Sequence, residues 1–416
     1  MTTAVPRRRL TLDLSPTRVS PGFRNLLIGD AVSVIGTQVT AVAIPLQVYA
    51  LTHSAATVGL VGLTGLVPLI VFGLYGGAVA DAVDRRKLVL VTTTLQAVLS
   101  TILLVQAVLE LRWTWLLFVV VAVQAGLFAL DSPARQAFIP NLLPKELLPA
   151  GNALRQVEFN VGMTGGPLLA GVIVAAFGFG SAYGLDAVSF AASLWAVASL
   201  PSMAPVGGGR KAGLASVIEG LTFLRTRRVL LLTFVVDIIA MVFGMPRTLF
   251  APLSDHVFGG GEAAAGALYA AIPAGALLGA LFGGWLGHVH KQGVAVVLAI
   301  VAWGGCVIGF GLTSHLWLAL VLLAGAGLAD MISAVFRTSI MQAAAPDDMR
   351  GRLGGVFIVV VAGGPRLGDG RAGAFADWFG LQEAVVIGGL LVIVLTLLVA
   401  VMVPRFLAYD SRDPHA

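Results

Sequence analysis

The sequence predicts an all-α membrane protein in which twelve transmembrane helices form two six-helix halves. Three observations carry this prediction: the composition, the number of long apolar runs, and a repeat that relates the two halves. Of the 416 residues, 58% are hydrophobic and only 11% are charged. Soluble globular proteins carry about 25% charged and about 45–50% apolar residues. The composition therefore excludes a water-soluble enzyme, a disordered chain and a nucleic-acid-binding protein.

Twelve runs are long and apolar enough to cross a membrane, because a spanning helix needs about 20 such residues. They cover residues 24–50, 56–80, 88–110, 114–137, 152–176, 182–201, 229–250, 265–287, 294–313, 316–338, 352–376 and 384–404. Charges interrupt the ends of the tenth and eleventh runs. The first run is too long for a cleaved signal peptide and lacks a small-residue cleavage site, so it predicts a first membrane helix.

A polar stretch from Pro201 to Arg228 separates the two sets of six runs. It contains GGGRK followed by EGLTFLRTRR, which predicts a cytoplasmic linker with a surface helix. The predicted organisation is a cytoplasmic N-terminal tail (1–22), an N-terminal six-helix bundle (23–200), the linker (201–228), a C-terminal six-helix bundle (229–404) and a cytoplasmic C-terminal tail (405–416).

The distribution of basic residues predicts the orientation of the chain. If the N-terminus lies inside, the inner side receives the basic clusters of both tails, of the linker and of residues 85–87, whereas the outer loops contain Arg112. Lys and Arg beside membrane spans retain loops in the cytoplasm. Both termini are therefore predicted to be cytoplasmic, and the net charge of +5 needs no nucleic-acid partner.

The two halves repeat each other at two nearly equal offsets. An offset of 207 relates Asp30 to Asp237, Pro45 to Pro252 and Gly59 to Gly266, and an offset of 202 relates Arg135 to Arg337, Pro144 to Pro346 and Gly171 to Gly373. Two helical halves related by an axis along the membrane normal are a transporter architecture. A substrate site is then expected between the halves near the midplane, and no catalytic chemistry is required.

The loop between the second and third runs carries the most specific motif, GGAVADAVDRRK (76–87). Its Gly77, the aspartate four residues later (Asp81) and the basic pair Arg85 and Arg86 resemble the loop signature of the major facilitator superfamily. A glycine at the first position allows helices to approach closely, because it has no side chain to hold the backbones apart. The resemblance implies the twelve-helix fold of that superfamily.

The resemblance also implies a gate on the cytoplasmic side. Asp81 would face the start of the eleventh helix near Arg350 and Gly351, where the positive end of a helix favours a carboxylate by about 0.3–1 kcal/mol. Arg85 would pair with Asp131 at the end of the fourth run. These contacts would hold the inner side closed while the transporter opens outward. The alternative is a tight turn whose basic residues only reflect the inside-positive bias.

The loop departs from the superfamily pattern at Ala82, where a basic residue is usual, and at Asp84, where glycine is usual. The equivalent loop of the second half, GGWLGHVHKQG, keeps the glycines but has His288 in place of the acid. The latch is therefore predicted to be one-sided.

Four longer stretches narrow the resemblance. Residues 42–60, 266–288 and 341–355 look like the enterobactin-exporter branch of the superfamily, and residues 131–154 are similar to the wider group that includes macrolide-efflux proteins. The resemblance implies a bacterial inner-membrane exporter of a siderophore or similar secondary metabolite, driven by the proton gradient. The alternative is a multidrug or macrolide-type pump. A remote alternative is a membrane-embedded enzyme or a non-transporting receptor.

Ionisable residues inside the spans are costly and usually face a cavity or a partner. Asp30 lies about 10 Å into the first helix at 1.5 Å per residue, and Asp237 is its repeat mate. Few basic residues are expected at that depth, so protonation is the simpler way to avoid a dry charge. The pair predicts proton coupling. The alternative is that each carboxylate is ion-paired and only holds helices together.

Glu158 and Asn160, just before GMTGGPLLAG (162–171), form a second candidate. This glycine- and proline-containing stretch resembles the fifth-helix signature of antiporters, and it makes Glu158 a further proton-coupling candidate and Asn160 a substrate-path candidate. The alternative is a kinked, tightly packed helix with no bearing on antiport.

The eleventh run contains Arg366, Asp369 and Arg371. Arg366 and Asp369 have the i, i+3 spacing that lets two side chains pair on one helix face. A structural pair is one interpretation. In the other, an arginine beside the cavity lies on the substrate path and suits an anionic ligand.

The remaining residues predict no metal, cofactor or catalytic site. The single cysteine, Cys306, excludes an intrachain disulfide, and His288 with His290 predicts a solvated loop rather than a metal site. The HExxH, GxxxxGK[ST] and Gly-x-Ser-x-Gly motifs are absent from the sequence. The predicted partners are a small-molecule substrate, the lipid bilayer and a proton as coupling ion, with the chain acting as a monomer.

Overall fold

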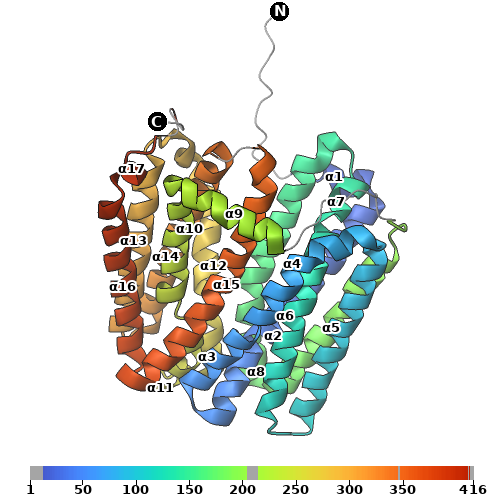
Figure 1. The fold of residues 1–416 in the computed structure, drawn as a ribbon. Coiled ribbons are helices and arrows are strands. Elements are labelled where there is room, and N and C mark those ends of the chain that lie inside the picture. Colours follow the sequence, from blue (N-terminus) through green and yellow to red (C-terminus); the bar gives the residue numbers. More distant parts are fainter. Residues whose placement is uncertain (1–12, 204–213, 345–346, 411, 413–416) are drawn as a thin grey trace, which may run out of the picture.

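The computed structural model describes residues 13–203, 214–344, 347–410 and 412. Within these residues the chain is helical and contains no strand. The long helices run side by side between two ends of the molecule (Figure 1). The short helices α1 (Ser15–Val19) and α17 (Pro404–Leu407) lie at the same end, which we call the terminal face, and the opposite end is the distal face.

The N-terminal half contains seven further helical segments. They are α2 (Pro21–Thr52), α3 (Ala55–Thr64), α4 (Leu66–Ala82), α5 (Arg85–Val108), α6 (Thr114–Gln136), α7 (Phe138–Leu142) and α8 (Leu148–Ala198), with the 3-10 turn η1 (Lys145–Leu147) before α8.

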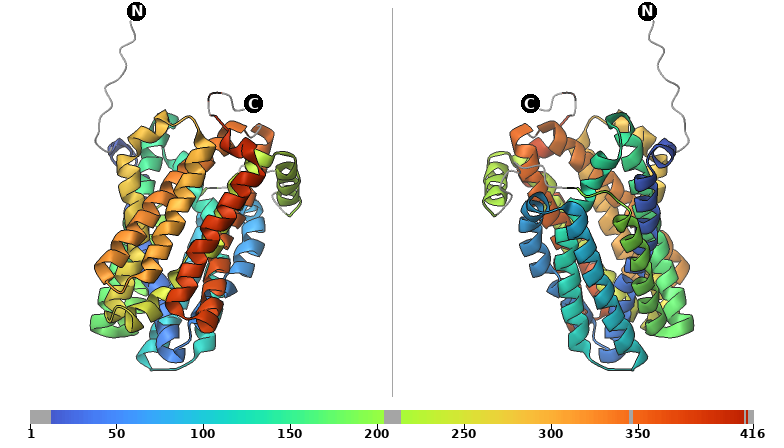
Figure 2. Two further views of the ribbon diagram at one scale, coloured as in Figure 1. Left: turned by 90° about the vertical axis from the view of Figure 1, so that its left-hand side faces the viewer. Right: turned by 90° about the vertical axis from the view of Figure 1, so that its right-hand side faces the viewer.

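The C-terminal half follows the helix α9 (Leu214–Thr226), which lies outside the bundle near the terminal face (Figure 2). Its helices are α10 (Arg228–Gly244), α11 (Phe250–His256), α12 (Gly261–Phe282), α13 (Gln292–Leu312), α14 (Leu316–Ala344), α15 (Asp347–Phe379) and α16 (Leu381–Met402), with the 3-10 segments η2 (Arg247–Leu249) and η3 (Gly283–His288).

Ten helical stretches of the described residues are long and apolar enough to cross a membrane. One of them, Lys145–Ala198, includes α8, which reverses direction at Gly178 near the distal face and so crosses twice. The backbone of Gly178 has φ 77°, a conformation that side-chain-bearing residues rarely adopt. With α15 as a further crossing, the described chain makes twelve, and the predicted all-α fold is confirmed.

The helices present apolar side chains to the outside as well as to the core. Phe282, Val401 and Trp378 are more than 70% exposed, and Trp303 and Phe310 are almost fully buried in the C-terminal half. A helix that is hydrophobic all round belongs in a large protein core or in a membrane, and here the outward side chains have no protein to cover them.

Two glycine pairs join the halves near the distal face. A Cβ on Gly266 of α12 would lie 2.7 Å from the Cα of Gly171 of α8, and a Cβ on Gly59 of α3 would lie 3.3 Å from the Cα of Gly373 of α15. Glycine is needed here because only the bare backbone permits this approach. The two contacts are repeat equivalents, since Gly59 corresponds to Gly266 and Gly171 to Gly373. The repeat found in the sequence is therefore a two-fold arrangement in space.

The seventh span differs most from its predicted form. The sequence predicted a single helix over 229–250, but α10 ends at Gly244 and the chain continues through η2 and α11 to His256. Pro246 explains the break, since proline has no N–H to donate to the preceding turn. This interruption places Arg247 beside the space between the halves.

Candidate functional site

A cavity of about 290 Å³ lies between the two halves. Its N-terminal wall comes from α2, α3 and α6 and is mainly apolar, with Ile44, Val61 and Phe128 among its side chains. Thr37 and Gln124 are its polar members on that side. Volumes of this order fit a small organic ligand, and a mostly apolar wall with a few polar groups is typical of such sites.

The C-terminal wall supplies the charge. Arg247, Thr248, Tyr269, Arg366 and Asp369 line the cavity from this side. Asp369 is nearly buried, lies 3.6 Å from the Arg247 guanidinium and accepts a hydrogen bond of 3.0 Å from the Thr248 hydroxyl. Two guanidinium groups and one carboxylate leave the cavity with a surplus positive charge, which favours an anion.

Arg247 is not a predicted site residue, and the break of the seventh span places it here. Gly244 and Pro246 were the available signal, because they mark the end of a helix within an apolar run. Discontinuous helices at the midplane build the binding sites of many secondary transporters.

The predicted pairing of Arg366 with Asp369 is wrong. Among the described residues Asp369 instead pairs with Arg247, because the break after α10 brings that arginine against α15. Arg371 donates hydrogen bonds of 3.0 and 2.7 Å to the carbonyl oxygens of Val242 and Phe243. These carbonyls belong to the last turn of α10, so Arg371 caps that helix rather than lining the cavity.

Asp30 lies in a charged network inside the N-terminal half, away from the cavity. Its two carboxylate oxygens lie 2.6 Å from the guanidinium groups of Arg135 and Arg155. Arg135 also pairs with Asp131, and Arg155 lies 3.0 Å from Glu158. The network joins α2, α6 and α8. The expectation that few basic residues lie at this depth is wrong, because α6 and α8 each bring an arginine to Asp30.

Hydroxyl groups complete this network. Arg135 donates to Thr93 at 2.7 Å and to Ser193 at 3.3 Å, and Thr92 donates to Asp131 at 2.8 Å. Thr92 and Thr93 lie on α5, so four long helices of the half meet at these groups. Both carboxylate oxygens of Asp30 therefore have polar partners.

The C-terminal half repeats the central pair, with fewer partners among the residues that the structure describes. Arg337 pairs with Asp237 and lies 3.6 Å from Asp330. Arg337 and Asp237 are the repeat mates of Arg135 and Asp30, so the two sequence offsets identify an equivalent ion pair. The Nε atom of Arg337 and the hydroxyl of Ser333 are buried without a described hydrogen-bond partner.

The loop motif on the terminal face forms local contacts. Asp81 is 40% exposed and lies 3.1 Å from Arg85 one turn later. Arg86 donates hydrogen bonds to the carbonyls of Val197 and Ala198, which ties the start of α5 to the end of α8. Gly77 lies within α4, and nothing further is described for it.

The implied Arg85–Asp131 pair is not formed in this structure, which is closed on the distal side. Asp131 is buried, forms an ion pair with Arg135 and accepts a hydrogen bond from Thr92. Arg85 instead forms an ion pair with Asp81 on the surface. Arg350 and Gly351, the implied partners of Asp81, lie in α15, and their contacts fall outside the described part of the chain.

Asp84, which departs from the family pattern, begins α5. Its carboxylate accepts a hydrogen bond from the backbone N–H of Lys87 at 3.1 Å and another from the Ser202 hydroxyl. The bonds from Ser202 and from the backbone hold the pKa of Asp84 below its usual value. An aspartate at this position is a helix N-cap, which glycine would not provide as well.

Asn160 accepts a hydrogen bond of 3.2 Å from Gln156 one turn earlier, on an exposed part of α8. It is not among the residues that line the central cavity. Its place on the substrate path therefore has no support from this structure. No group of three or more metal-ligating side chains occurs in the described part of the chain.

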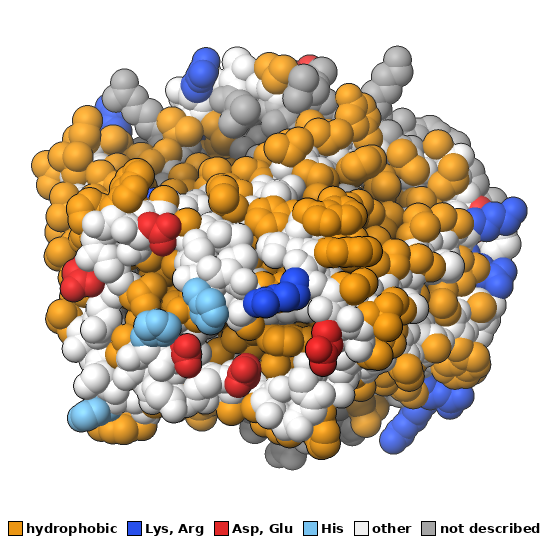
Figure 3. Space-filling view, turned by 90° about the horizontal axis from the view of Figure 1, so that it is seen from below, with side chains coloured by type: hydrophobic (Ala, Val, Ile, Leu, Met, Phe, Trp, Pro, Cys, Tyr) orange, Lys and Arg blue, Asp and Glu red, His pale blue; other side chains and the backbone are white. Residues whose placement is uncertain are grey.

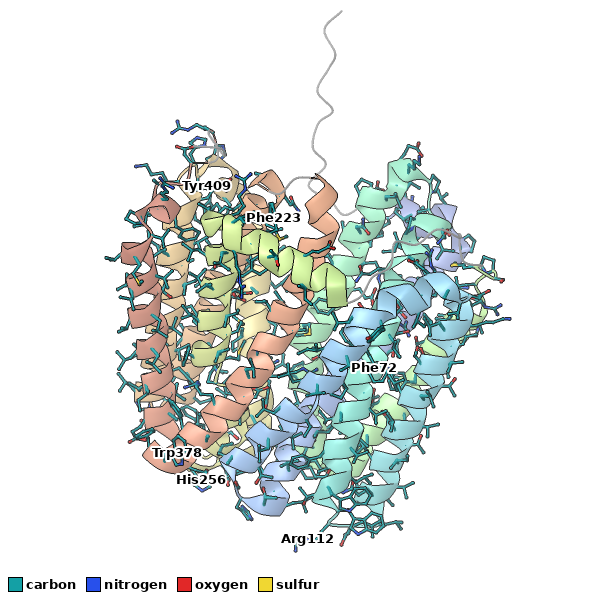
Figure 4. The ribbon with its side chains drawn as sticks, in the orientation of Figure 1. Phe72, Arg112, Phe223, His256, Trp378 and Tyr409 are labelled. Carbon is teal, nitrogen blue, oxygen red and sulfur yellow. The ribbon has the colours of Figure 1, made fainter. Side chains whose placement is uncertain are left out.

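The distal face carries a contact between the halves at the repeat axis. The Tyr49 hydroxyl of α2 lies 3.4 Å from Nδ1 of His256 of α11, and these two residues are 207 positions apart. His53 packs edge-on against Tyr49, and Asp255 lies 3.5 Å from His256. Figure 4 shows His256 at this end, and Figure 3 shows histidine and acidic side chains on the same face. With the glycine pairs, this contact closes the distal side.

Comparisons with known proteins agree with this geometry. A family model described as "Transmembrane secretion effector" matches residues 12–415. The chain is 30% identical over 406 residues to the enterobactin exporter EntS of Shigella boydii serotype 18, covering 95% of each protein, and equally similar to the EntS of Escherichia coli O1:K1.

Solved structures share the fold at low sequence identity. The nucleoside transporter NupG superposes with a TM-score of 0.72 at 13% identity, over 92% of this chain and 98% of that one. A POT family transporter in complex with a thioalcohol-conjugated peptide gives a TM-score of 0.71 at 15% identity, over 93% and 96% of the two chains. At this identity the likeness concerns the fold alone.

Proposed function

The chain belongs to the transmembrane secretion effector family of the major facilitator superfamily, a family of membrane transporters rather than enzymes, and on this premise we propose that it exports an anionic siderophore-like metabolite. The observation that carries the proposal is the central cavity, in which Arg247 and Arg366 outnumber the single carboxylate of Asp369. The iron-binding oxygens of siderophores carry negative charge, which this set would complement. The relatives named as enterobactin exporters support the same class of substrate.

The proposed mechanism is alternating access between the two halves. The distal side is closed by the two glycine pairs and by the Tyr49–His256 contact. We propose that the terminal face is cytoplasmic, because Arg18 of α1, Arg405 of α17 and the 85–87 cluster lie there and Arg112 lies on the distal face (Figures 1 and 4). The ligand would then enter from the cytoplasm. One chain holds both walls of the cavity, so a monomer suffices.

In the outward-facing state, Asp81 is proposed to leave Arg85 and approach the start of α15. Its 40% exposure in the present state makes the carboxylate free to move. This transfer would close the terminal side while the distal contacts separate. Gly77 would permit the close approach of α4 that this closure requires.

Proton coupling is proposed to use the charged networks rather than the cavity. The N-terminal network has three carboxylates (Asp30, Asp131, Glu158) and two guanidinium groups (Arg135, Arg155), so it carries one surplus negative charge. Asp30 contacts two arginines and Asp131 contacts one arginine and the Thr92 hydroxyl, whereas Glu158 contacts one arginine alone. Protonation of Glu158 would therefore break the fewest contacts within the network.

The same balance holds in the other half. Among the described side chains, Asp237 and Asp330 share the guanidinium of Arg337, which leaves one surplus negative charge. Asp330 is the more weakly held of the two and is 34% exposed. We assign the proton-binding role here to Asp330, with Asp237 as the structural partner of Arg337.

The test is export into everted membrane vesicles with and without a pH gradient, using an anionic siderophore and a neutral ligand of similar size. Replacing Arg247 by Gln should weaken export of the anion by about tenfold, because hydrogen bonds to charged groups contribute about 1.5–3 kcal/mol. Arg247→Lys keeps the charge and should retain most of the activity. Equal losses for the anionic and neutral ligands would contradict an anion site.

A lipophilic drug is the second candidate substrate. The apolar wall formed by Ile44, Val61 and Phe128 favours it. In the same vesicles, export of a neutral drug that is insensitive to Arg247→Gln would support this alternative over the siderophore.

A further inference from the structure

A second and larger cavity, of about 770 Å³, lies at the distal end of the N-terminal half. It is bounded by the end of α2, the end of α5, the loop that follows α5, and the reversal of α8 at Gly178. None of its lining residues lines the central cavity. Figure 4 shows Arg112, which borders it, at the distal end of the molecule.

The walls of this cavity are mainly apolar. Leu51, Leu104, Val108 and Phe177 contribute side chains, and Val108 and Phe177 are 64% and 73% exposed. On the α8 side the lining includes Gly184, whose missing side chain leaves space: a Cβ there would be in ordinary contact, 3.6 Å from Leu104. An exposed apolar cavity of this kind suits a hydrocarbon chain better than a soluble ion.

A buried polar group in the same wall lacks a partner. Gln106 is 1% exposed, and its amide nitrogen donates hydrogen bonds of 3.2 Å to the carbonyls of Leu111 and Trp113, which fixes the loop. Its amide oxygen has no hydrogen-bond partner among the described residues. The loop that carries Glu110 and Arg112 is therefore held in place from the buried side of the cavity wall.

The rim carries one charge of each sign. Glu110 and Arg112 both line the cavity, and neither forms an ion pair with another described residue. Glu110 is held in the left-handed backbone region at φ 53°, which turns the loop sharply between the two charged groups. A lipid headgroup that carries both a negative and a positive charge could pair with Arg112 and Glu110 at the same time.

The same rim lies at the expected level of the lipid headgroups. Trp113 and Trp115 stack with ring centroids 6.1 Å apart and are 50% and 60% exposed. Exposed tryptophans at the ends of spans mark the membrane–water interface. The apolar part of the cavity therefore faces the acyl region, and Glu110 with Arg112 faces the headgroup region.

We propose that this cavity binds a phospholipid of the distal leaflet whose headgroup contains a primary amine. Arg112 holds the phosphate, Glu110 accepts hydrogen bonds from the ammonium group, and an acyl chain lies along Val108 and Phe177. A quaternary choline headgroup has no N–H to donate, and a glycerol headgroup has no positive charge. The site therefore distinguishes phosphatidylethanolamine from phosphatidylcholine and phosphatidylglycerol.

The test measures lipid retention by native mass spectrometry on the purified full-length chain, and it requires no transport. Phosphatidylethanolamine, phosphatidylcholine and phosphatidylglycerol with identical acyl chains are offered at equal concentration. The wild-type protein should retain phosphatidylethanolamine in preference to the other two. Arg112→Gln should reduce retention of all three by about threefold to fivefold, the size expected for one exposed ion pair.

Three further variants separate headgroup recognition from general lipid binding. Glu110→Gln should remove the preference for phosphatidylethanolamine over phosphatidylcholine, whereas Glu383→Gln, an exposed acid at the distal end of the other half, should not. Gly184→Leu fills the cavity and should reduce retention of every lipid. Gly305→Leu, at a glycine of α13 with open space around it, is the control for added bulk.

The outcomes are decisive for the lipid site alone. Equal retention of the three lipids by the wild type, or equal retention by the Gly184→Leu and Gly305→Leu variants, would overturn the proposal. Either result would leave the proposed export through the central cavity intact. A monodisperse gel-filtration profile and an unchanged helical circular dichroism spectrum show that each variant is folded.

Discussion

The two halves of this transporter share one ion pair but surround it differently. In the N-terminal half, Arg135 contacts two carboxylates and two hydroxyls from four helices. In the C-terminal half its repeat mate Arg337 contacts two carboxylates, and one of its nitrogens is buried without a described partner. The same position in the repeat is thus part of a dense network on one side and of a sparse one on the other.

The difference indicates that the two halves have different roles in transport. The dense network joins α2, α5, α6 and α8 into one unit, whereas the C-terminal half has the interrupted seventh span and supplies all the charges of the central cavity. Buried ion networks are most convincingly linked to a specific arrangement of elements rather than to net stability. We infer that the N-terminal half is the rigid partner and that the C-terminal half carries the binding groups that respond to the ligand.

The largest expected effect comes from deleting each central arginine. Arg135→Met leaves Asp30 and Asp131 buried with fewer cations and should lower the free energy of unfolding by about 3–5 kcal/mol. Arg337→Met should cost less, because it breaks two described contacts rather than four and Asp330 is partly exposed and can be solvated, although it also removes the cation of the buried Asp237. Thermal unfolding in detergent, followed by tryptophan fluorescence, measures both changes. Equal losses in the two variants would remove the distinction between a dense and a sparse network.

Much of this comparison could be predicted from the sequence. Apolar run lengths gave the spans, and the offsets of 207 and 202 related Asp30 to Asp237 and Arg135 to Arg337 before their contacts were known. The partners could not be predicted, because partner choice depends on which helix faces meet. Arg155 reaches Asp30 from α8, 125 residues away in the chain.

The cavity was predicted less well than the fold. The charge of Arg366 and Asp369 within an apolar run marks them as candidates, but the apolar run over 229–250 predicts an unbroken helix. An unbroken helix does not indicate that Arg247 faces the cavity. In the structure Arg247 pairs with Asp369, and Arg366 does not form the expected pair. A break within a span changes which side chains face inward, and periodicity alone does not report it.

A smaller effect on stability, but a large one on coupling, is expected at the surplus carboxylates. Glu158→Gln and Asp330→Asn each remove one negative charge from a network that has one too many, so both proteins should fold and bind ligand. Export driven by a pH gradient should fall in both, and binding measured without a gradient should remain.

Asp30→Asn and Asp237→Asn are the matched comparisons. Each also weakens transport, but each should lower the unfolding temperature as well, since it takes away the carboxylate that an arginine holds. If the double variant Glu158→Gln, Asp330→Asn still concentrates substrate in response to a pH gradient, these two residues do not carry the coupling proton.

The smallest expected effect compares the starts of two equivalent helices. Asp84 caps α5 through the N–H of Lys87, and its repeat mate Lys291 stands at the cap of α13 without a side-chain hydrogen bond. Replacing an N-cap aspartate by alanine costs about 1 kcal/mol, so Asp84→Ala should destabilise the protein by that amount at neutral pH. Lys291→Asp should stabilise it by about 0.5–1 kcal/mol, since a carboxylate there can accept from the first turn and suits the helix dipole.

The pH dependence of the first variant follows from the lowered pKa of Asp84. A carboxylate whose pKa is lower in the folded state than in the unfolded chain stabilises the fold above the unfolded value of about 3.9. That contribution is lost as the pH falls through the folded pKa. The difference in unfolding temperature between wild type and Asp84→Ala should therefore be constant near neutrality and narrow below about pH 4. A difference that persists unchanged into acid would mean that Asp84 acts through packing rather than as a charged cap, and the contrast between the two helix starts would then have another cause.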